Sequence, residues 1–209
     1  MEPAVREDLE EAMLRELGEK GRDGISLTDV LAEVGVAAED FAEAYGDLDA
    51  CLDAAYERIT LRLDAAVRVS CATGGQIAAP EDADWRTRVR AGLESILAEL
   101  ADRPSEARAL ARVYPSLGPG QQARYQAFVE RLAWQLRARR QLAGIEGDLP
   151  DSVDALAVGS AEAIVFEEIT AGRTEALPGM GPAILFSLLV PYVGSTEAAA
   201  EMERARQEP

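Results

Sequence analysis

The sequence contains no histidine among its 209 residues. Histidine is the usual general base at neutral pH and the commonest metal ligand in proteins, so its absence argues against both roles. The sequence also lacks a nucleophile paired with a base, a cluster of metal-ligating residues and a glycine-rich phosphate loop. It therefore predicts neither an enzyme nor a site for a metal or cofactor.

Cysteine is scarce, with only Cys51 and Cys71. Both fall on one expected helix, about 30 Å apart at about 1.5 Å per residue, which is too far for a disulfide. No neighbouring histidine or lysine would lower a thiol pKa, so inert packing is favoured over a sensor of oxidants or electrophiles. With no signal peptide visible, we expect a cytoplasmic, reduced protein.

Basic residues are few relative to acidic ones: 21 against 38, which gives a net charge of −17. The first fifty residues hold fifteen acids and four bases. Neutralisation of phosphates by Lys and Arg supplies most non-specific affinity for DNA. An acidic surface instead repels DNA over about 8 Å at physiological salt. The charge of the chain therefore disfavours ordinary nucleic-acid binding.

Long apolar runs are also missing. The strongest, residues 183–193, is shorter than the roughly 20 residues that span a bilayer and contains Pro191, so no membrane partner is expected. Alanine, leucine, glutamate and arginine dominate, and their apolar spacing is helical. The sequence predicts an all-α protein of about nine helices. They cover residues 3–20, 26–34, 37–45, 48–71, 85–100, 104–113, 121–140, 151–171 and 183–193, with breaks at 72–84, 118–120, 144–150 and 178–182.

Residues 26–46 have the pattern of a helix-turn-helix. Ser26 is a good N-cap, and Gly35 supplies the left-handed residue after the first short helix. Phe41 and Tyr45 lie one turn apart on the second helix. In such motifs the second helix usually enters the DNA major groove. We therefore expect a domain with the helix-turn-helix of a DNA-binding protein at 1–46, called the head below. A helical domain at 47–194 and a charged, frayed tail at 195–209 are expected to follow it.

Two of the later helices predict a homodimer. Small residues recur every fourth position in 151–171, which lets another helix approach closely. The 183–193 helix is apolar on nearly every face, so it must be covered on both sides. Two helices from each of two chains would cover it as a four-helix bundle. The expected interface residues are Ala155, Gly159, Ala163, Ile184, Leu188 and Tyr192.

Five stretches carry a resemblance to a known family: LEEAMLRELGEKG, SLTDVLAEVGV, FAEAYGDLDACLDAAYERI, AGRTEALPGM and LLVPYVG. They span residues 9–59 and parts of 150–194; residues 84–103 are also similar. In these stretches the chain resembles the TetR family of bacterial transcriptional regulators, in its actinobacterial form. The resemblance implies three N-terminal helices for DNA, a fourth that leads into a ligand-binding bundle, and dimerisation through the last two helices.

The resemblance also implies which positions would contact DNA, and their chemistry is atypical. Family members usually place Ser or Thr and then a base at 37 and 38, a polar residue at 40, Tyr at 42, His or Arg at 43, and Lys at 48. Ser26 and Thr28 remain plausible phosphate contacts, although Ser26 also has the capping role. The matched positions here are Ser26, Thr28, Ala37, Ala38, Asp40, Ala42, Glu43 and Leu48.

The family places a ligand within the C-terminal bundle, and here a small apolar or cationic ligand is expected. Ordinary core packing is the alternative for each candidate residue, and solvation or pairing across a dimer is the alternative for Glu162. Four arginines at 131, 137, 139 and 140 could meet an anion or the protein's own acidic half, or could favour the negative end of their helix. The pocket candidates are Trp85, Leu93, Leu97, Tyr114, Tyr125, Phe128, Trp134, Glu162 and Phe166.

Two functional hypotheses remain open. The first is a homodimeric, ligand-responsive regulator, expected to be a repressor in the manner of the family. In this hypothesis the ligand shifts the fourth helix and so changes the spacing of the two helix-turn-helix domains in the dimer. Such a shift requires different ligand affinities in two conformations. The second is a binding module of the same fold whose acidic head no longer binds DNA. That head would contact a basic partner protein or have no partner.

Overall fold

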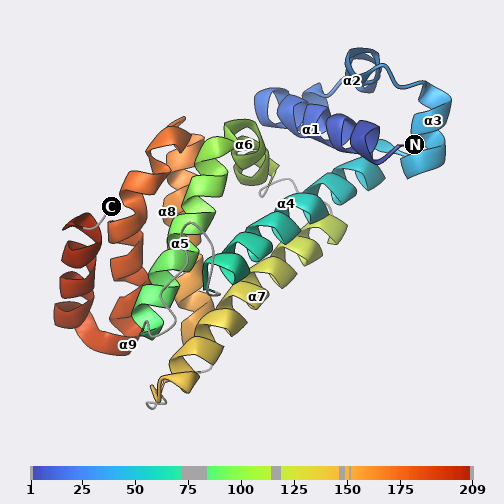
Figure 1. Ribbon diagram of the computed structural model, residues 1–209. Coiled ribbons are helices and arrows are strands. Elements are labelled where there is room, and N and C mark those ends of the chain that lie inside the picture. The colour runs from blue at the N-terminus through green and yellow to red at the C-terminus, as the bar shows by residue number, and fades with distance from the viewer. Residues whose placement is uncertain (1, 72–83, 114–118, 146–148, 151, 208–209) are drawn as a thin grey trace. The chain divides into compact units, whose positions relative to one another are not determined.

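The computed structural model describes residues 2–71, 84–113, 119–145, 149–150 and 152–207. These residues form nine α-helices and two short 3-10 helices, with no strand among them, which confirms the all-α prediction (Figure 1). The helices are α1 Pro3–Lys20, α2 Leu27–Val34, α3 Ala38–Tyr45, α4 Leu48–Cys71, α5 Trp85–Asp102, α6 Pro104–Val113, α7 Pro119–Leu142, α8 Val153–Thr170 and α9 Leu177–Gln207; the 3-10 helices are η1 Arg22–Gly24 and η3 Thr174–Ala176.

The chain divides into two compact units. The first contains residues 1–61 and 103–125, and the second contains 62–102 and 126–209. This division differs from the expected boundary at residue 46, because the first half of α4, all of α6 and the start of α7 belong with the N-terminal helices. Sequence order alone could not place α6 there, since a long stretch of chain, including all of α2 to α5, separates it from α1.

The first unit is closed by the packing of α1 on α6. Leu9, Leu14 and Leu17 of α1 are completely buried. Gly18 lets the helices meet, because a Cβ added there would lie 2.7 Å from the Ser105 carbonyl oxygen of α6. The buried Tyr56 hydroxyl of α4 donates to the Ala109 carbonyl oxygen of α6 at 3.0 Å. Three helices thus share one core beneath the helix-turn-helix.

Cys51 belongs to this core and is fully buried. Burial, together with the nearby Glu10 carboxylate, raises the pKa of its thiol to about 12. The thiol therefore stays protonated at physiological pH, and only the thiolate is an effective nucleophile. This supports the packing role expected for Cys51; the side chain of Cys71 lies outside the described residues.

The second unit is built around α9, which packs against α5 and α8 (Figure 1). Leu97 of α5 and Ile184 of α9 are fully buried there, and Ile169 of α8 nearly so. The predicted break at 178–182 is wrong, because α9 begins at Leu177 and runs through it. Pro178 is tolerated as the second residue of α9, where its missing N–H would have no partner, whereas Pro182 lies inside the helix.

The predicted frayed tail at 195–209 is also wrong over its described residues. A kink at Gly194 (φ 77°, ψ 167°) redirects α9, which then stays helical to Gln207 (Figure 1). Ala198 is completely buried. Arg86 of α5 donates to Glu197 at 2.7 Å and to Glu201 at 3.2 Å. The acidic residues that suggested a solvated tail instead attach this segment to α5.

The segment Thr174–Gln207 is long and apolar enough to cross a membrane by length and composition alone. Its most apolar 18-residue window has a mean hydropathy of 1.6 and is 33% buried within the chain. Buried Ile184, Leu185 and Leu189 show that one side of α9 belongs to the core of the second unit. Much apolar surface of the window remains uncovered by this chain.

Candidate nucleic-acid interface

The helix-turn-helix has the local geometry that its sequence predicts. The Ser26 hydroxyl accepts a hydrogen bond from the Asp29 amide at 3.3 Å and caps α2. Gly35 adopts left-handed angles of φ 75° and ψ 31°, and Val36 N–H donates to the Leu31 carbonyl oxygen at 2.9 Å. These are the bonds of a glycine-terminated helix, and they turn the chain directly into α3.

The inner side of α3 is anchored by two aromatic residues. Phe41 is 3% exposed, and its ring centroid lies 5.5 Å from that of Tyr45. The Tyr45 hydroxyl donates to the Glu10 carboxylate of α1 at 2.9 Å, and burial with this hydrogen bond raises the pKa of Tyr45. Just after α3, Asp47 caps the following α4 by accepting from the Ala50 amide. The inner side and the C-terminal end of α3 are therefore fixed within the first unit.

The structure brings the family-matched DNA positions to the surface, although their chemistry is not basic. Ser26 and Leu48 are partly exposed, and the other six are exposed. The six are Thr28, Ala37, Ala38, Asp40, Ala42 and Glu43. Since Ser26 already uses its hydroxyl as a cap, Thr28 is the one matched position with an exposed, uncommitted hydroxyl.

The N-terminus of α3 is also electrostatically unsuited to phosphate. A helix N-terminus normally attracts anions through its free amides and its positive dipole end. Here Ala37 offers no side-chain cap, and Glu39 and Asp40 occupy the first turn. Their carboxylates sit where a phosphate would otherwise be attracted, so they offset the favourable field of the helix.

Each of the four bases in the first fifty residues is engaged inside the first unit. Arg15 pairs with Glu33, Arg22 with Asp49, and Lys20 with Glu16 one turn before it. The Arg6 guanidinium carbon lies 5.2 Å from the centroid of the Tyr45 ring, in a cation–π contact. Any contact of these side chains with DNA would compete with an existing partner.

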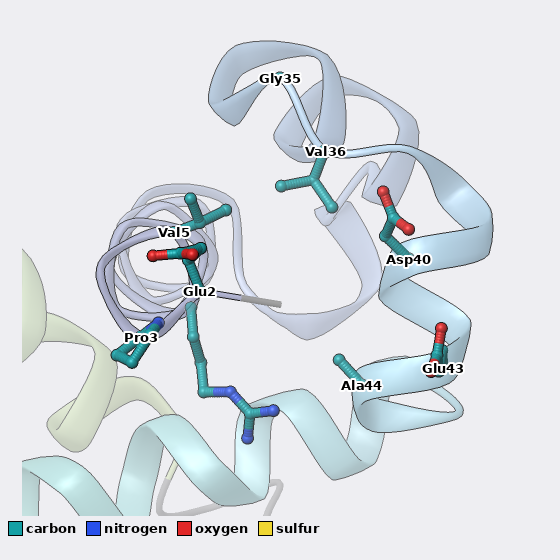
Figure 2. Close-up of a pocket in the computed structure, with 9 residues that line it drawn as sticks. Glu2, Pro3, Val5, Gly35, Val36, Asp40, Glu43 and Ala44 are labelled. Atoms are coloured by element: carbon teal, nitrogen blue, oxygen red, sulfur yellow. The ribbon is translucent and has the colours of Figure 1, made fainter.

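A concavity of about 740 Å³ lies between the beginning of α1 and α3. Figure 2 shows Glu2, Pro3 and Val5 on one wall, and Val36, Asp40, Glu43 and Ala44 on the other. Arg6 and the backbone of Gly35 complete its lining. The sequence did not predict this groove, because its two walls come from segments that are well separated along the chain.

The predicted ligand-pocket residues are only partly brought together. Trp85, Leu93, Leu97 and Phe128 are buried in the second unit, and Glu162 and Phe166 are half-buried there. Tyr125 is buried but belongs to the first unit, and Tyr114 lies outside the described residues. The prediction that Trp134 lines an interior pocket is wrong, because its side chain is 68% exposed. Trp134 lies on the side of α7 that faces away from the core.

The arginine cluster of α7 has partners within the chain. Arg137 and Arg140 bind the carboxylate of Asp154, which is 1% exposed at the start of α8. Arg137 Nε donates at 2.9 Å, Arg140 Nε and Nη2 donate at 2.9 and 3.1 Å, and the Tyr192 hydroxyl of α9 donates at 2.9 Å. Arg140 also donates to the Ile145 carbonyl oxygen at 3.0 Å. This network joins three helices of the second unit.

Sequence reasoning missed Asp154, although a signal was present. Arg137 and Arg140 lie one turn apart near the end of one helix, and Asp154 begins the next. Only about ten residues separate the two helices in the sequence, so the end of the first can lie near the start of the second. Of the other two arginines, Arg139 donates to its own helix at the Gln135 carbonyl oxygen, and Arg131 contacts the Phe128 ring. Two of the four arginines therefore bind one acid of the same chain, at the start of α8.

Solved structures with the same architecture identify the fold. The TetR-family transcriptional regulator PfmR from Thermus thermophilus is 18% identical, covers 89% of this chain and 94% of its own, and superposes with a TM-score of 0.65. A chain from Pseudomonas aeruginosa, assigned as a transcriptional regulator, is 24% identical over 99% of this chain and 96% of its own, with a TM-score of 0.69. The chain has the TetR fold.

Other comparisons define how far this identification reaches. A TetR-family regulator from Streptomyces coelicolor covers 99% of this chain and 90% of its own at 14% identity, with a TM-score of 0.58. No family model and no curated protein matches the sequence. The TetR fold is therefore shared over nearly the whole chain.

Within the TetR fold, the predicted dimer residues separate into two groups. Ala155 and Ala163 of α8 are exposed and Gly159 is half-exposed. Ile184 and Leu188 of α9 are 0% and 7% exposed, so the prediction that they face a partner is wrong. They pack inside their own chain, because an all-round apolar helix does not reveal which side its own core covers. Tyr192 is half-buried and bonded to Asp154.

Proposed function

We propose that this protein is a cytoplasmic, homodimeric transcriptional regulator that responds to a small apolar or cationic ligand in its C-terminal bundle. The observation that carries the proposal is an intact helix-turn-helix framework, with Gly35 left-handed and Phe41 buried, on a chain that has the TetR fold over nearly its full length. Trp85, Leu97 and Phe128 are the core residues around which we place the ligand.

Ligand response in this proposal runs through α4. That helix is continuous from Leu48 to Cys71, with its first part in one compact unit and its last part in the other. A ligand that binds one conformation of the bundle more tightly than another shifts the population toward it.

The proposed dimer uses the exposed face of α8. Leu156 is 70% exposed beside Ala155 and Gly159, and a Cβ added at Gly159 would meet nothing within 4 Å in the single chain. A small-residue face with open space in front of it allows a second helix to approach closely. The uncovered apolar surface of α9 extends the area that a second copy would bury.

We therefore expect Gly159→Leu to weaken the dimer without unfolding the chain. The new side chain has open space within one protomer but would block the approach of a partner helix. Sedimentation equilibrium should show a wild-type dimer at micromolar concentration and a dissociation constant at least about tenfold higher for the variant, a change of about 1.4 kcal/mol. Gln126→Leu, an exposed site on α7, is the matched control. A wild-type monomer at micromolar concentration would refute the dimer.

DNA binding is tested with duplex DNA from the promoter of the protein's own gene. We expect saturable binding by fluorescence anisotropy at about 50 mM salt. The affinity should depend less steeply on salt than that of typical DNA-binding proteins, because the head has few Lys and Arg side chains to neutralise phosphates. A scrambled duplex of equal length is the control. Absence of binding at this salt would overturn the regulator proposal.

A second candidate is favoured by the acidic surface of α3. With Glu39, Asp40 and Glu43 exposed and the bases of residues 1–50 engaged, the head would act as a module that no longer binds DNA. In that case the dimer persists in sedimentation while anisotropy with promoter DNA stays flat at every salt concentration. The two measurements together distinguish the candidates.

A further inference from the structure

We propose that the groove between the start of α1 and α3 is a docking site for a basic amphipathic segment of a partner protein, which inserts a lysine or arginine side chain. The groove measures about 740 Å³ and opens on the surface of the first unit (Figure 2). The inference goes beyond the regulator proposal and does not depend on whether the head binds DNA.

Apolar atoms form one part of the groove. Val5, Val36 and Ala44 line it and are each partly exposed, and Pro3 is exposed at its edge. Figure 2 shows Val36 and Ala44 projecting from the α3 side toward the wall formed by α1. The methylene stems of Lys and Arg pack on apolar surface of this kind while their charged ends stay at the rim.

Carboxylates form the other part. Glu2 lies on the α1 wall, and Asp40 and Glu43 lie on the α3 wall. All three are exposed, and within the described chain none of them has a basic partner. The one base in the lining, Arg6, has its guanidinium over the Tyr45 ring. The groove therefore presents an excess of negative charge beside the apolar side chains of its two walls.

This combination selects among possible occupants. DNA phosphates would be repelled by Glu2, Asp40 and Glu43. A metal ion requires converging ligands, and the described residues contain no group of three or more side chains placed to hold one. A basic protein segment supplies both an aliphatic stem for Val5 and Val36 and a positive charge for the rim, which matches both parts of the lining.

The test is fluorescence anisotropy of the full chain with a fluorescein-labelled peptide of alternating leucine and arginine, without DNA. The groove variant is D40N/E43Q. The matched control is E39Q/D23N, which removes the same charge from exposed positions of the same unit outside the groove lining. Each replacement is nearly isosteric, and far-UV circular dichroism confirms that both variants keep their helices.

We expect D40N/E43Q to weaken peptide binding at least about tenfold and E39Q/D23N to change it less than about twofold. The reason is that an arginine bound in the groove lies close to the carboxylates of Asp40 and Glu43 and is attracted most strongly by them. Equal losses in the two variants would overturn the proposal, because they would show attraction to general acidity. Absence of peptide binding to the wild-type chain would also overturn it. A monomer or a flat promoter assay would refute only the regulator proposal.

Discussion

Replacing Asp154 with asparagine is expected to lower the free energy of unfolding by about 3–5 kcal/mol, the usual cost of removing one partner from a buried ion pair. Asp154 is 1% exposed and accepts hydrogen bonds from Arg137, Arg140 and Tyr192. Asparagine keeps the size of the side chain but removes the carboxylate charge that binds the guanidinium of Arg140, a residue only 6% exposed. The loss is therefore electrostatic and not a cavity.

Chemical denaturation in urea measures this loss at neutral pH. Glu175→Gln, an exposed site just before α9, is the control and should change stability by less than about 0.5 kcal/mol. Tyr192→Phe removes a single hydrogen bond to Asp154 and should cost about 1 kcal/mol. If the asparagine variant were as stable as the control, the network would carry no net stabilisation.

The same carboxylate predicts a pH dependence. Burial alone would raise the pKa of Asp154, but the hydrogen bonds from Arg140, Arg137 and Tyr192 outweigh it and hold the pKa below its ordinary value of 3.8. Because the folded state binds this proton more weakly than the unfolded state, the contribution of Asp154 is complete above the ordinary pKa and is lost as pH falls below it. Asp154→Asn should lack this part of the acid destabilisation.

Reversing two charges on α3, with D40K/E43K, is expected to raise the affinity for non-sequence-specific duplex DNA at about 50 mM salt at least about tenfold. Both side chains are exposed on the helix whose counterpart in helix-turn-helix proteins enters the major groove. The substitutions remove two carboxylates that repel phosphate and add two bases. Each phosphate neutralised also steepens the dependence of log affinity on log salt by about 0.9.

Anisotropy titrations across salt check both parts of this expectation. The control is E130K/E175K, which makes the same change in net charge at exposed positions of the second unit. A gain confined to D40K/E43K would locate the barrier to DNA binding at the surface of α3. Equal gains in both variants would instead assign it to the net charge of −17, and no gain in either would show that the head is unsuited to DNA in shape as well as in charge.

The helix-turn-helix could be predicted in detail because its determinants are local. Ser26 caps α2, Gly35 takes the left-handed turn, and Phe41 one turn before Tyr45 provides the buried side of α3. Each residue acts within a few positions of itself, so spacing along the chain reports its structural role. The acidic chemistry of Asp40 and Glu43 could be anticipated in the same way, since exposed residues keep the charge that the sequence gives them.

The second unit shows where local patterns stop being informative. Pro178 and Pro182 suggested a break, yet α9 runs through both. Pro178 is the second residue of the helix, where a missing amide needs no partner, whereas Pro182 lies inside the helix and shows that a proline does not by itself end it. The acids of 195–207 suggested a frayed tail, yet Glu197 and Glu201 pair with Arg86, which lies far away in the sequence. A charged segment whose composition suggests exposure to solvent can therefore be held against the core by a partner that is distant in the sequence.

The sequence by itself determined the helices before α9, the turn at Gly35 and the acidic outer face of α3, because these depend on neighbouring residues and on exposed charge. Only the tertiary structure decided that Asp154 is the counter-ion of Arg137 and Arg140, that Ile184 is buried within its own chain, and that α1 and α3 enclose a groove. Burial and pairing depend on surfaces that are brought together from distant parts of the sequence. The spacing of apolar residues along one helix does not show which surface that helix will meet.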